Sequence, residues 1–162
     1  MDETWEGRMA AVWASASTVG AARVTSAIDA LVAQRPDTDA RAVFESASAR
    51  DYADREADAE PLYRRALSLG LAEPFRGRAV IQLASTLRNL GRAAEAIDVL
   101  QEGFSDDPEH SLADAARAFL ALCLADTGDA RAAAAVALDA LAPHLPEYAR
   151  AVRAYAAQLA VE

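Results

Sequence analysis

The sequence contains no lysine: all sixteen basic residues are arginine, and they face twenty-five Asp and Glu residues, for a net charge of −9. Binding to nucleic acid requires a positive face, so this charge balance argues against nucleic acid as a partner. We attribute the absence of lysine to a genome biased toward Ala, Arg and Gly codons. Arginine also suits bidentate contacts with carboxylates better than lysine does.

Cysteine is nearly absent, and the single Cys123 cannot build a disulfide framework, so an oxidising compartment is not indicated. The first residues, "MDETWEGRM", are acidic where a secretory signal needs positive charge. The apolar-looking run over 9–33 contains Arg23 and Asp29, so it is not a membrane span. We therefore expect a cytoplasmic protein with no membrane partner.

Residues that carry chemistry are also scarce. The two histidines, His110 and His144, have no second metal ligand at helical spacing, and no glycine-rich phosphate loop or hydrolase motif occurs. Cys123 lies among apolar residues, where a free cysteine behaves as a small hydrophobe. The sequence therefore predicts no enzyme activity, no metal site and no cofactor.

Good helix formers dominate the chain, and no alternating strand pattern appears. Glycine, proline and aspartate residues interrupt the chain at regular intervals and divide it into nine predicted helices. These helices cover residues 3–16, 20–34, 38–53, 56–69, 74–90, 92–105, 109–127, 129–142 and 146–160. The fold class is therefore predicted to be all-α.

Local signals predict how several of these helices begin and end. Pro36 with Asp37 and Thr38 closes one helix and caps the next, while Gly70 suits a left-handed C-terminal stop. Asp58 as an N-cap would place Pro61 in a first turn, where proline costs little. A later helix has two competing starts, at Asp107–Pro108 or at Ser111 with Asp114 as a capping-box variant.

A repeat organises the centre of the chain. Ala59, Ala96 and Ala133 lie 37 residues apart, and so do Asp54, Gly91 and Gly128 just before them. An alanine that faces its partner lets two antiparallel helices approach closely, and a residue at the corner must leave helical geometry. Glycine does so at no steric cost, and aspartate less readily. A period of this length built from two helices indicates a stacked helical solenoid.

These residues resemble the tetratricopeptide repeat family, over residues 40–142. The best copy carries Leu83, Ala84, Leu87, Gly91, Ala96, Leu100 and Pro108. The following copy carries Leu120, Ala121, Leu124, Gly128, Ala133 and Leu141, and the preceding one Ala47, Ala59, Tyr63, Ala66 and Leu67. "EPLYRRAL" and "LASTLRNLGR" are similar to the bacterial group-five repeats. The resemblance implies a right-handed superhelix, an alpha-solenoid of antiparallel hairpins, whose concave groove is lined by the first helix of each repeat.

We expect three parts along the chain. Residues 1–36 form an N-terminal helical pair, which either caps the solenoid or makes a dimer contact through Trp5 and Trp13. Residues 37–145 form three hairpins. Residues 146–162 form a C-terminal capping helix, with Tyr148, Val152, Tyr155 and Leu159 on one face.

The groove that the resemblance implies is the candidate binding site. Helical spacing assigns it Arg41, Phe44, Ser48, Asp51, Tyr52, Arg78, Gln82, Ser85, Arg88, Asn89, Phe119 and Leu122. Such a surface can hydrogen-bond an extended peptide, and Arg88 with Arg78 can hold a carboxylate. The simpler alternative is that these residues only form the solvent-exposed face of amphipathic helices. The Lys- and Asn-based clamp of chaperone-binding relatives is missing, so a chaperone C-terminus is not an expected ligand.

The sequence thus favours a non-catalytic interaction module that binds a protein or peptide segment. A self-assembling scaffold that forms a homodimer through the N-terminal helices is the main alternative. A small-ligand sensor is a third hypothesis, with less support from the sequence.

Overall fold

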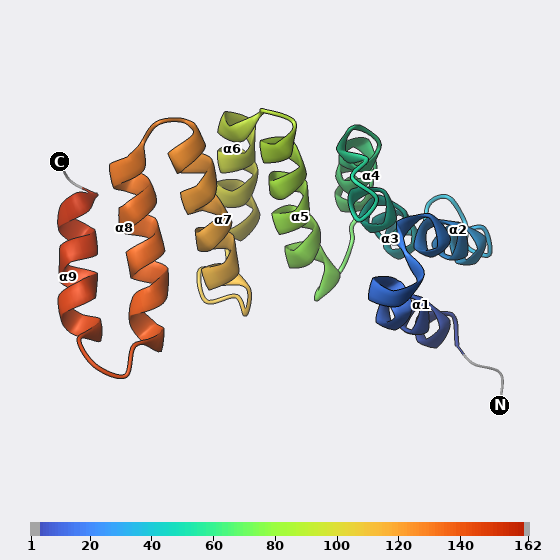
Figure 1. The fold of residues 1–162 in the computed structure, drawn as a ribbon, viewed down its shortest axis with the longest axis horizontal. Coiled ribbons are helices and arrows are strands. Elements are labelled where there is room, and N and C mark those ends of the chain that lie inside the picture. The colour runs from blue at the N-terminus through green and yellow to red at the C-terminus, as the bar shows by residue number, and fades with distance from the viewer. Residues whose placement is uncertain (1–3, 161–162) are drawn as a thin grey trace. The chain divides into compact units, whose positions relative to one another are not determined.

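The computed structural model describes residues 4–160, and every regular element within them is a helix, which confirms the predicted all-α class (Figure 1). The elements are α1 (Trp5–Val19), α2 (Ala21–Val32), α3 (Ala40–Asp51), α4 (Glu56–Ser68), α5 (Phe75–Asn89), α6 (Ala93–Phe104), α7 (Ala113–Asp126), α8 (Ala130–Leu141), the 3-10 helix η1 (Ala142–His144) and α9 (Ala149–Leu159). The predicted start of the first helix at residue 3 lies outside the described residues.

The chain divides into two compact units, one ending at Gln82 and the other beginning at Leu83, so the division falls inside α5. In the first unit, α1 packs against α2, α2 against α3, and α3 against α4. In the second unit, α6 packs against α7, α7 against α8, and α8 against α9. Each unit therefore consists of helices packed on their neighbours in sequence, as stacked helix hairpins require.

The predicted alanine contacts are confirmed. Ala59, Ala96 and Ala133 are all buried. Four residues after the first two stand the large side chains of Tyr63 and Leu100, which are also buried. The alanines therefore lie where helices meet, and the larger neighbours fill the space beside them.

The predicted corners are confirmed as well. Asp54, Gly91 and Gly128 have positive φ angles of 53°, 76° and 90°. At each corner the next N–H donates to the carbonyl oxygen five residues earlier: Arg55 to Arg50 at 3.0 Å, Arg92 to Leu87 at 2.9 Å and Asp129 to Leu124 at 2.9 Å. This is the Schellman arrangement, which satisfies carbonyls that the end of a helix leaves without partners. Gly70 ends α4 in the same way, at φ 80°.

The N-terminal pair, α1 and α2, shares a hydrophobic core with α3. Trp5, Met9, Val24 and Ile28 are buried with residues of α3, and the indole Nε1–H of Trp5 donates to the Leu31 carbonyl at 2.9 Å. The pair thus packs its apolar side chains onto the first hairpin.

Several predicted helix starts were wrong. Asp39, not Thr38, caps α3 by accepting from the N–H groups of Arg41 and Ala42. The helix α4 begins at Glu56, so Pro61 lies inside it and Asp58 is not its cap. Both Ala57 and Pro61 are exposed, so water can replace the hydrogen bond that the proline removes.

The start of α7 also differs from both predicted alternatives. The helix begins at Ala113, and its N-cap Leu112 makes no side-chain hydrogen bond, so the capping box of Ser111 and Asp114 is not formed. Instead, His110 Nδ1 accepts from the Leu112 N–H at 3.1 Å, and the His110 ring packs edge-on against Phe104. The imidazole therefore organises the turn that leads into α7.

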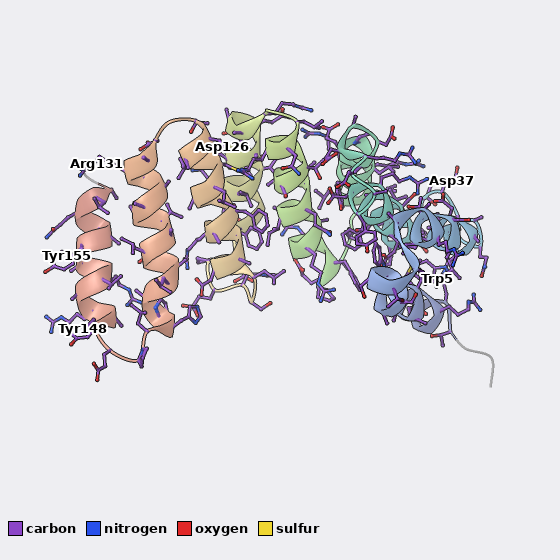
Figure 2. All side chains as sticks on the ribbon, viewed as in Figure 1. Trp5, Asp37, Asp126, Arg131, Tyr148 and Tyr155 are labelled. Atoms are coloured by element: carbon purple, nitrogen blue, oxygen red, sulfur yellow. The ribbon has the colours of Figure 1, made fainter. Side chains whose placement is uncertain are left out.

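The predicted apolar face of the last helix needs correction. Tyr148 is 76% exposed and Tyr155 is 63% exposed, and Figure 2 shows both side chains pointing away from α8. Tyr148 precedes α9 with a left-handed φ of 66°, so it cannot share a helical face with Val152. The residues of α9 that are not exposed are instead Ala149, Val152, Ala156 and Leu159, which keep 3–4 spacing within the helix.

Candidate interaction surface

In the first unit, the predicted surface is formed by α3 and the first turns of α5. Arg41 on α3 and Arg78 on α5 lie 37 residues apart, so they occupy the same position in consecutive repeats. Four residues further on, the same position holds Glu45 in the first repeat and Gln82 in the second. One helical turn separates each arginine from its neighbour, which therefore lies on the same face.

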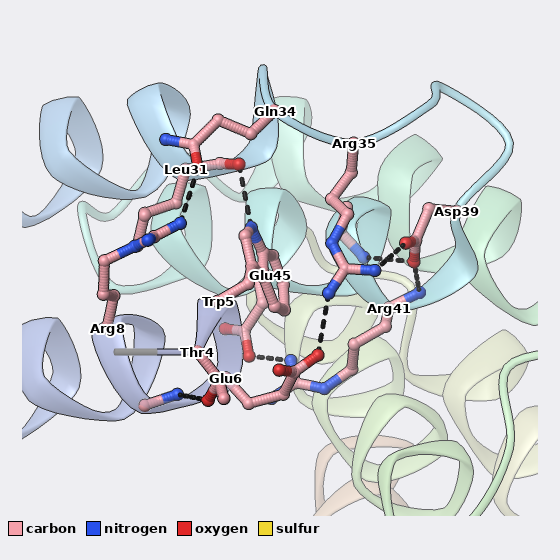
Figure 3. A network of polar contacts seen from close by, with 12 residues as sticks. Thr4, Trp5, Glu6, Arg8, Leu31, Gln34, Arg35, Asp39, Arg41 and Glu45 are labelled. Atoms are coloured by element: carbon pink, nitrogen blue, oxygen red, sulfur yellow. Dashed lines mark hydrogen bonds and ion pairs between the residues drawn. The ribbon is translucent and has the colours of Figure 1, made fainter. Parts of the chain in front are cut away.

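Arg41 forms a half-buried ion pair with Glu45, a carboxylate that is only 2% exposed (Figure 3). The second carboxylate oxygen of Glu45, Oε2, accepts a hydrogen bond from the Trp13 Nε1–H at 2.6 Å. A buried charge is tolerated only when it is paired and hydrogen-bonded, and Glu45 meets both conditions. The pair thereby ties α1 to α3.

Aromatic rings lie beneath the arginines. The Arg41 guanidinium carbon is 3.5 Å from the Phe75 ring centre, and that of Arg78 is 5.6 Å from the same centre. Burial, and the positive charge of Arg78, lower the pKa of Arg41 to about 10. Arg41 remains charged at neutral pH, so two cations share one ring.

Phe44 and Ser48 belong to the core rather than to the contact surface. Both are buried, and Phe44 packs against Tyr63 and Phe75 with ring centres 6.1 and 5.8 Å away. The helical spacing that assigned them to the groove was therefore wrong about their exposure. Phe44 supports the ring on which the arginines lie, but it does not reach the surface.

Asp51 and Tyr52 end α3 and contact other elements of the same unit. The Tyr63 hydroxyl donates to Asp51 Oδ2 at 3.1 Å, and burial raises the pKa of that tyrosine. The Tyr52 hydroxyl donates to the Ala16 carbonyl at 3.1 Å, while its ring meets Trp13 edge-on. Tyr52 nevertheless remains exposed on one side.

In the second unit, the residues predicted to line the binding surface come from the end of α5 and from α7. Arg88 pairs with Asp126, its Nε lying 2.6 Å from Oδ2. Asn89 and Leu122 are exposed, while Ser85 and Phe119 are half-buried. Arg88 therefore already has a carboxylate partner within its own unit.

Sequence reasoning missed the network that surrounds Trp5. Arg35 stacks over the Trp5 ring at 4.7 Å and pairs with Glu6 at 2.8 Å and Asp39 at 3.5 Å (Figure 3). The missed partners of Arg41 are Glu45 on α3 and Phe75 on α5, and Trp13 on α1 donates in turn to Glu45. Only the i, i+4 spacing of Arg41 and Glu45 could have been recognised from the sequence.

The second unit also has a small recess between α6 and α7, with a volume of about 170 Å³. It is lined by Leu100, Gln101, Phe104, Pro108, Ala113, Ala116, Arg117 and Leu120. Sites for small-molecule ligands are typically about 300–1,000 Å³, so this recess is small for such a ligand. Arg117, one of the lining residues, contacts Asp114 at 2.9 Å, and Asp114 also contacts His144 at 2.9 Å.

Among residues 4–160, no group of three or more His, Cys, Asp or Glu side chains is arranged to hold a metal ion. None of the helices in this range has the length and apolar character that crossing a membrane requires.

Comparison with protein families gives one match. Residues 40–159 match the model for group-five tetratricopeptide repeats, which is described as "Tetratrico peptide repeat". No curated protein and no solved structure matches the chain significantly. The match begins at Ala40, where the predicted resemblance also begins, and it continues through α9. Given the buried alanines, the left-handed corners and a match over most of its length, the chain belongs to the tetratricopeptide repeat family.

Proposed function

We propose that this protein is a non-catalytic module that binds a peptide or protein segment on the first helices of its repeats. Members of the family are typically protein-interaction or scaffold modules. The proposed contact residues are the predicted ones, without the buried Phe44 and Ser48. They are Arg41, Asp51, Tyr52, Arg78 and Gln82 in the first unit, and Ser85, Arg88, Asn89, Phe119 and Leu122 in the second.

One observation carries this proposal: the first helices keep exposed side chains at matching positions of the repeat. Tyr52, Asn89 and Asp126 lie 37 residues apart at the ends of α3, α5 and α7, and all three are exposed. On α7, Leu122 is 46% exposed, one turn before Asp126. Polar and apolar groups that alternate along a helix face are what an extended peptide needs for hydrogen bonds and side-chain contacts.

The test begins with a peptide library displayed on phage and selected against the intact chain. We expect selected peptides to lose about fivefold or more in affinity when Leu122 is replaced by serine, because a contacted leucine contributes about 1 kcal/mol or more. The matched control is Leu141→Ser on the second helix α8, since Leu141 is 47% exposed and is not a proposed contact. Fluorescence polarisation measures both affinities. If no peptide is selected, or if both variants bind equally well, the proposed surface is wrong.

Self-assembly through the N-terminal helices remains the second candidate, because the family also serves as scaffold. Trp5 is committed to the core of its own chain, and the Trp13 indole donates to Glu45. This arrangement favours a capping role for the pair over a dimer contact. A small-ligand sensor gains little support from a recess of about 170 Å³. Cytoplasmic location stays a prediction.

A further inference from the structure

Arg41 and Arg78 hold the same position in consecutive repeats but differ in how their charges are neutralised. Arg41 has Glu45 four residues later and pairs with it. Arg78 has Gln82 at that place, and the Gln82 Oε1 atom is buried without a hydrogen-bond partner among residues 4–160. Within the described part of the chain, Arg78 makes no ion pair, and its described contact is the Phe75 ring. The second repeat therefore keeps the cation of the first repeat and lacks its counter-ion.

The position of Arg78 concentrates this positive charge. Arg78 is exposed, so a ligand can reach its guanidinium, while Arg41 next to it is half-buried over the same ring. Burial is the largest cause that lowers the pKa of Arg41, and repulsion from the positive charge of Arg78 lowers it further. A negative group placed at Arg78 would relieve this repulsion, and the apolar ring would exclude water on one side of the contact.

We propose that Arg78, with Arg41 beside it and Phe75 beneath it, binds a carboxylate of the peptide partner. This inference rests on the proposed function. It states which chemical group of the partner binds to the first unit. A guanidinium presents a planar pair of N–H donors that matches the two oxygens of a carboxylate. The chain as a whole carries a net charge of −9, so an acidic peptide is repelled elsewhere and gains most at an unneutralised arginine.

The charge balance favours a carboxylate over a phosphate. Glu45 neutralises Arg41, and the negative charges of Glu6 and Asp39 also act on Arg41, so the site offers at most about one uncompensated positive charge, that of Arg78. A carboxylate carries one negative charge, whereas a phosphate monoester carries about 1.5 to 2 at neutral pH. A side-chain carboxylate and a C-terminal carboxylate share the same chemistry, and the test separates them.

The direct test follows the arginine side-chain Nε–H signals by NMR in the intact chain. The probes are N-acetylglutamate α-amide for a side-chain carboxylate, N-acetylleucine for a C-terminal carboxylate, and N-acetylphosphoserine α-amide for a phosphate. The neutral N-acetylglutamine α-amide is the blank. We expect a saturable shift of the Arg78 signal with at least one carboxylate probe and no shift with the blank.

Two variants with matched controls assign the shift to this site. Gln82→Glu restores the counter-ion that the first repeat has, and we expect it to weaken carboxylate binding about tenfold. Gln158→Glu adds the same charge on the exposed face of α9 and should change nothing. Arg78→Gln should abolish the response of Arg41 to the probe, whereas Arg23→Gln, which removes an exposed arginine of α2, should not. Circular dichroism confirms that each variant is folded.

The outcomes separate this inference from the proposed function. Equal shifts with acid and amide probes, tighter binding of the phosphate probe, or indifference to Gln82→Glu would overturn the carboxylate site. Phage-selected peptides that bind without any acidic group would overturn it too, while the interaction function would stand. A specific carboxylate response together with a failed peptide selection would uphold the site and overturn the peptide-binding function.

Discussion

Ala59, Ala96 and Ala133 show how single residues set the distance between helices in this protein. All three are buried at intervals of 37 residues. A larger side chain at such a place must either push the helices apart or leave its preferred rotamer. The spacing alone was sufficient to predict that these three alanines lie inside.

Replacing Ala96 with leucine should overpack the interface of α6. We expect a loss of about 1–3 kcal/mol in the free energy of unfolding, measured by chemical denaturation. Ala94→Leu is the matched control, because Ala94 is exposed on the same helix. Equal stability of the two variants would mean that Ala96 does not pack between helices.

The corner at Gly91 needs glycine because of its backbone conformation, and not because a side chain would lack room. Its φ is 76°, and a Cβ atom added there would meet no atom within 4 Å. Gly91→Val should therefore cost about 1–2 kcal/mol purely from the left-handed conformation. Gly91→Asn should cost clearly less, because Asn tolerates this region, as Asp54 does in the first repeat. Thermal unfolding of both variants measures the difference, and equal losses would argue against a conformational cause.

At the scale of elements, a polar contact connects α7 with the 3-10 helix η1. His144 Nε2 lies 2.9 Å from Asp114 Oδ2, and Arg117 contacts the other oxygen of the same carboxylate. The hydrogen bond from His144 is the largest cause that lowers the pKa of Asp114 below its ordinary value. Because the folded-state pKa is lowered, the stabilisation is present above the unfolded pKa of about 3.9 and is lost as the pH falls through the folded-state value.

Removing this hydrogen bond should raise the pKa of Asp114 toward its ordinary value. We expect His144→Ala to do so, while His144→Gln keeps a donor and retains more of the lowering. Titration of the Asp114 carboxyl carbon by NMR measures the pKa directly. Thermal melts of His144→Ala should fall below those of the unmodified chain at neutral pH and converge with them under acid. An unchanged Asp114 pKa in His144→Ala would show that Arg117 alone stabilises the carboxylate.

At the scale of the whole molecule, the contacts of the two tryptophans predict whether the chain associates with itself. The indoles of Trp5 and Trp13 donate within the chain, to Leu31 and Glu45. We therefore expect sedimentation velocity to give one species near 17.1 kDa at all concentrations. A concentration-dependent dimer that Trp13→Ala disrupts would instead support the scaffold alternative.

Much of the fold could be predicted from the sequence, and less of the candidate site. All nine predicted helices have a counterpart in residues 4–160, although α7 begins at Ala113 rather than at residue 109. Of the predicted surface residues, Phe44 and Ser48 are buried, and Arg88 is paired with Asp126. Helical spacing reports which residues share a face, but it does not report how closely the neighbouring helices cover that face.

The amino-acid sequence by itself determined the helices, the corners and the family. Helix propensity, the left-handed corners at Gly91 and Gly128, and a spacing of 37 residues are all local properties of the chain. Only the tertiary structure decided which arginines have counter-ions. Pairing depends on side chains that come from different helices. The Arg41–Glu45 pair on α3, for example, is contacted by Trp13 of α1 and Phe75 of α5. For this reason Arg78 stands out as an unneutralised cation only after the chain has folded.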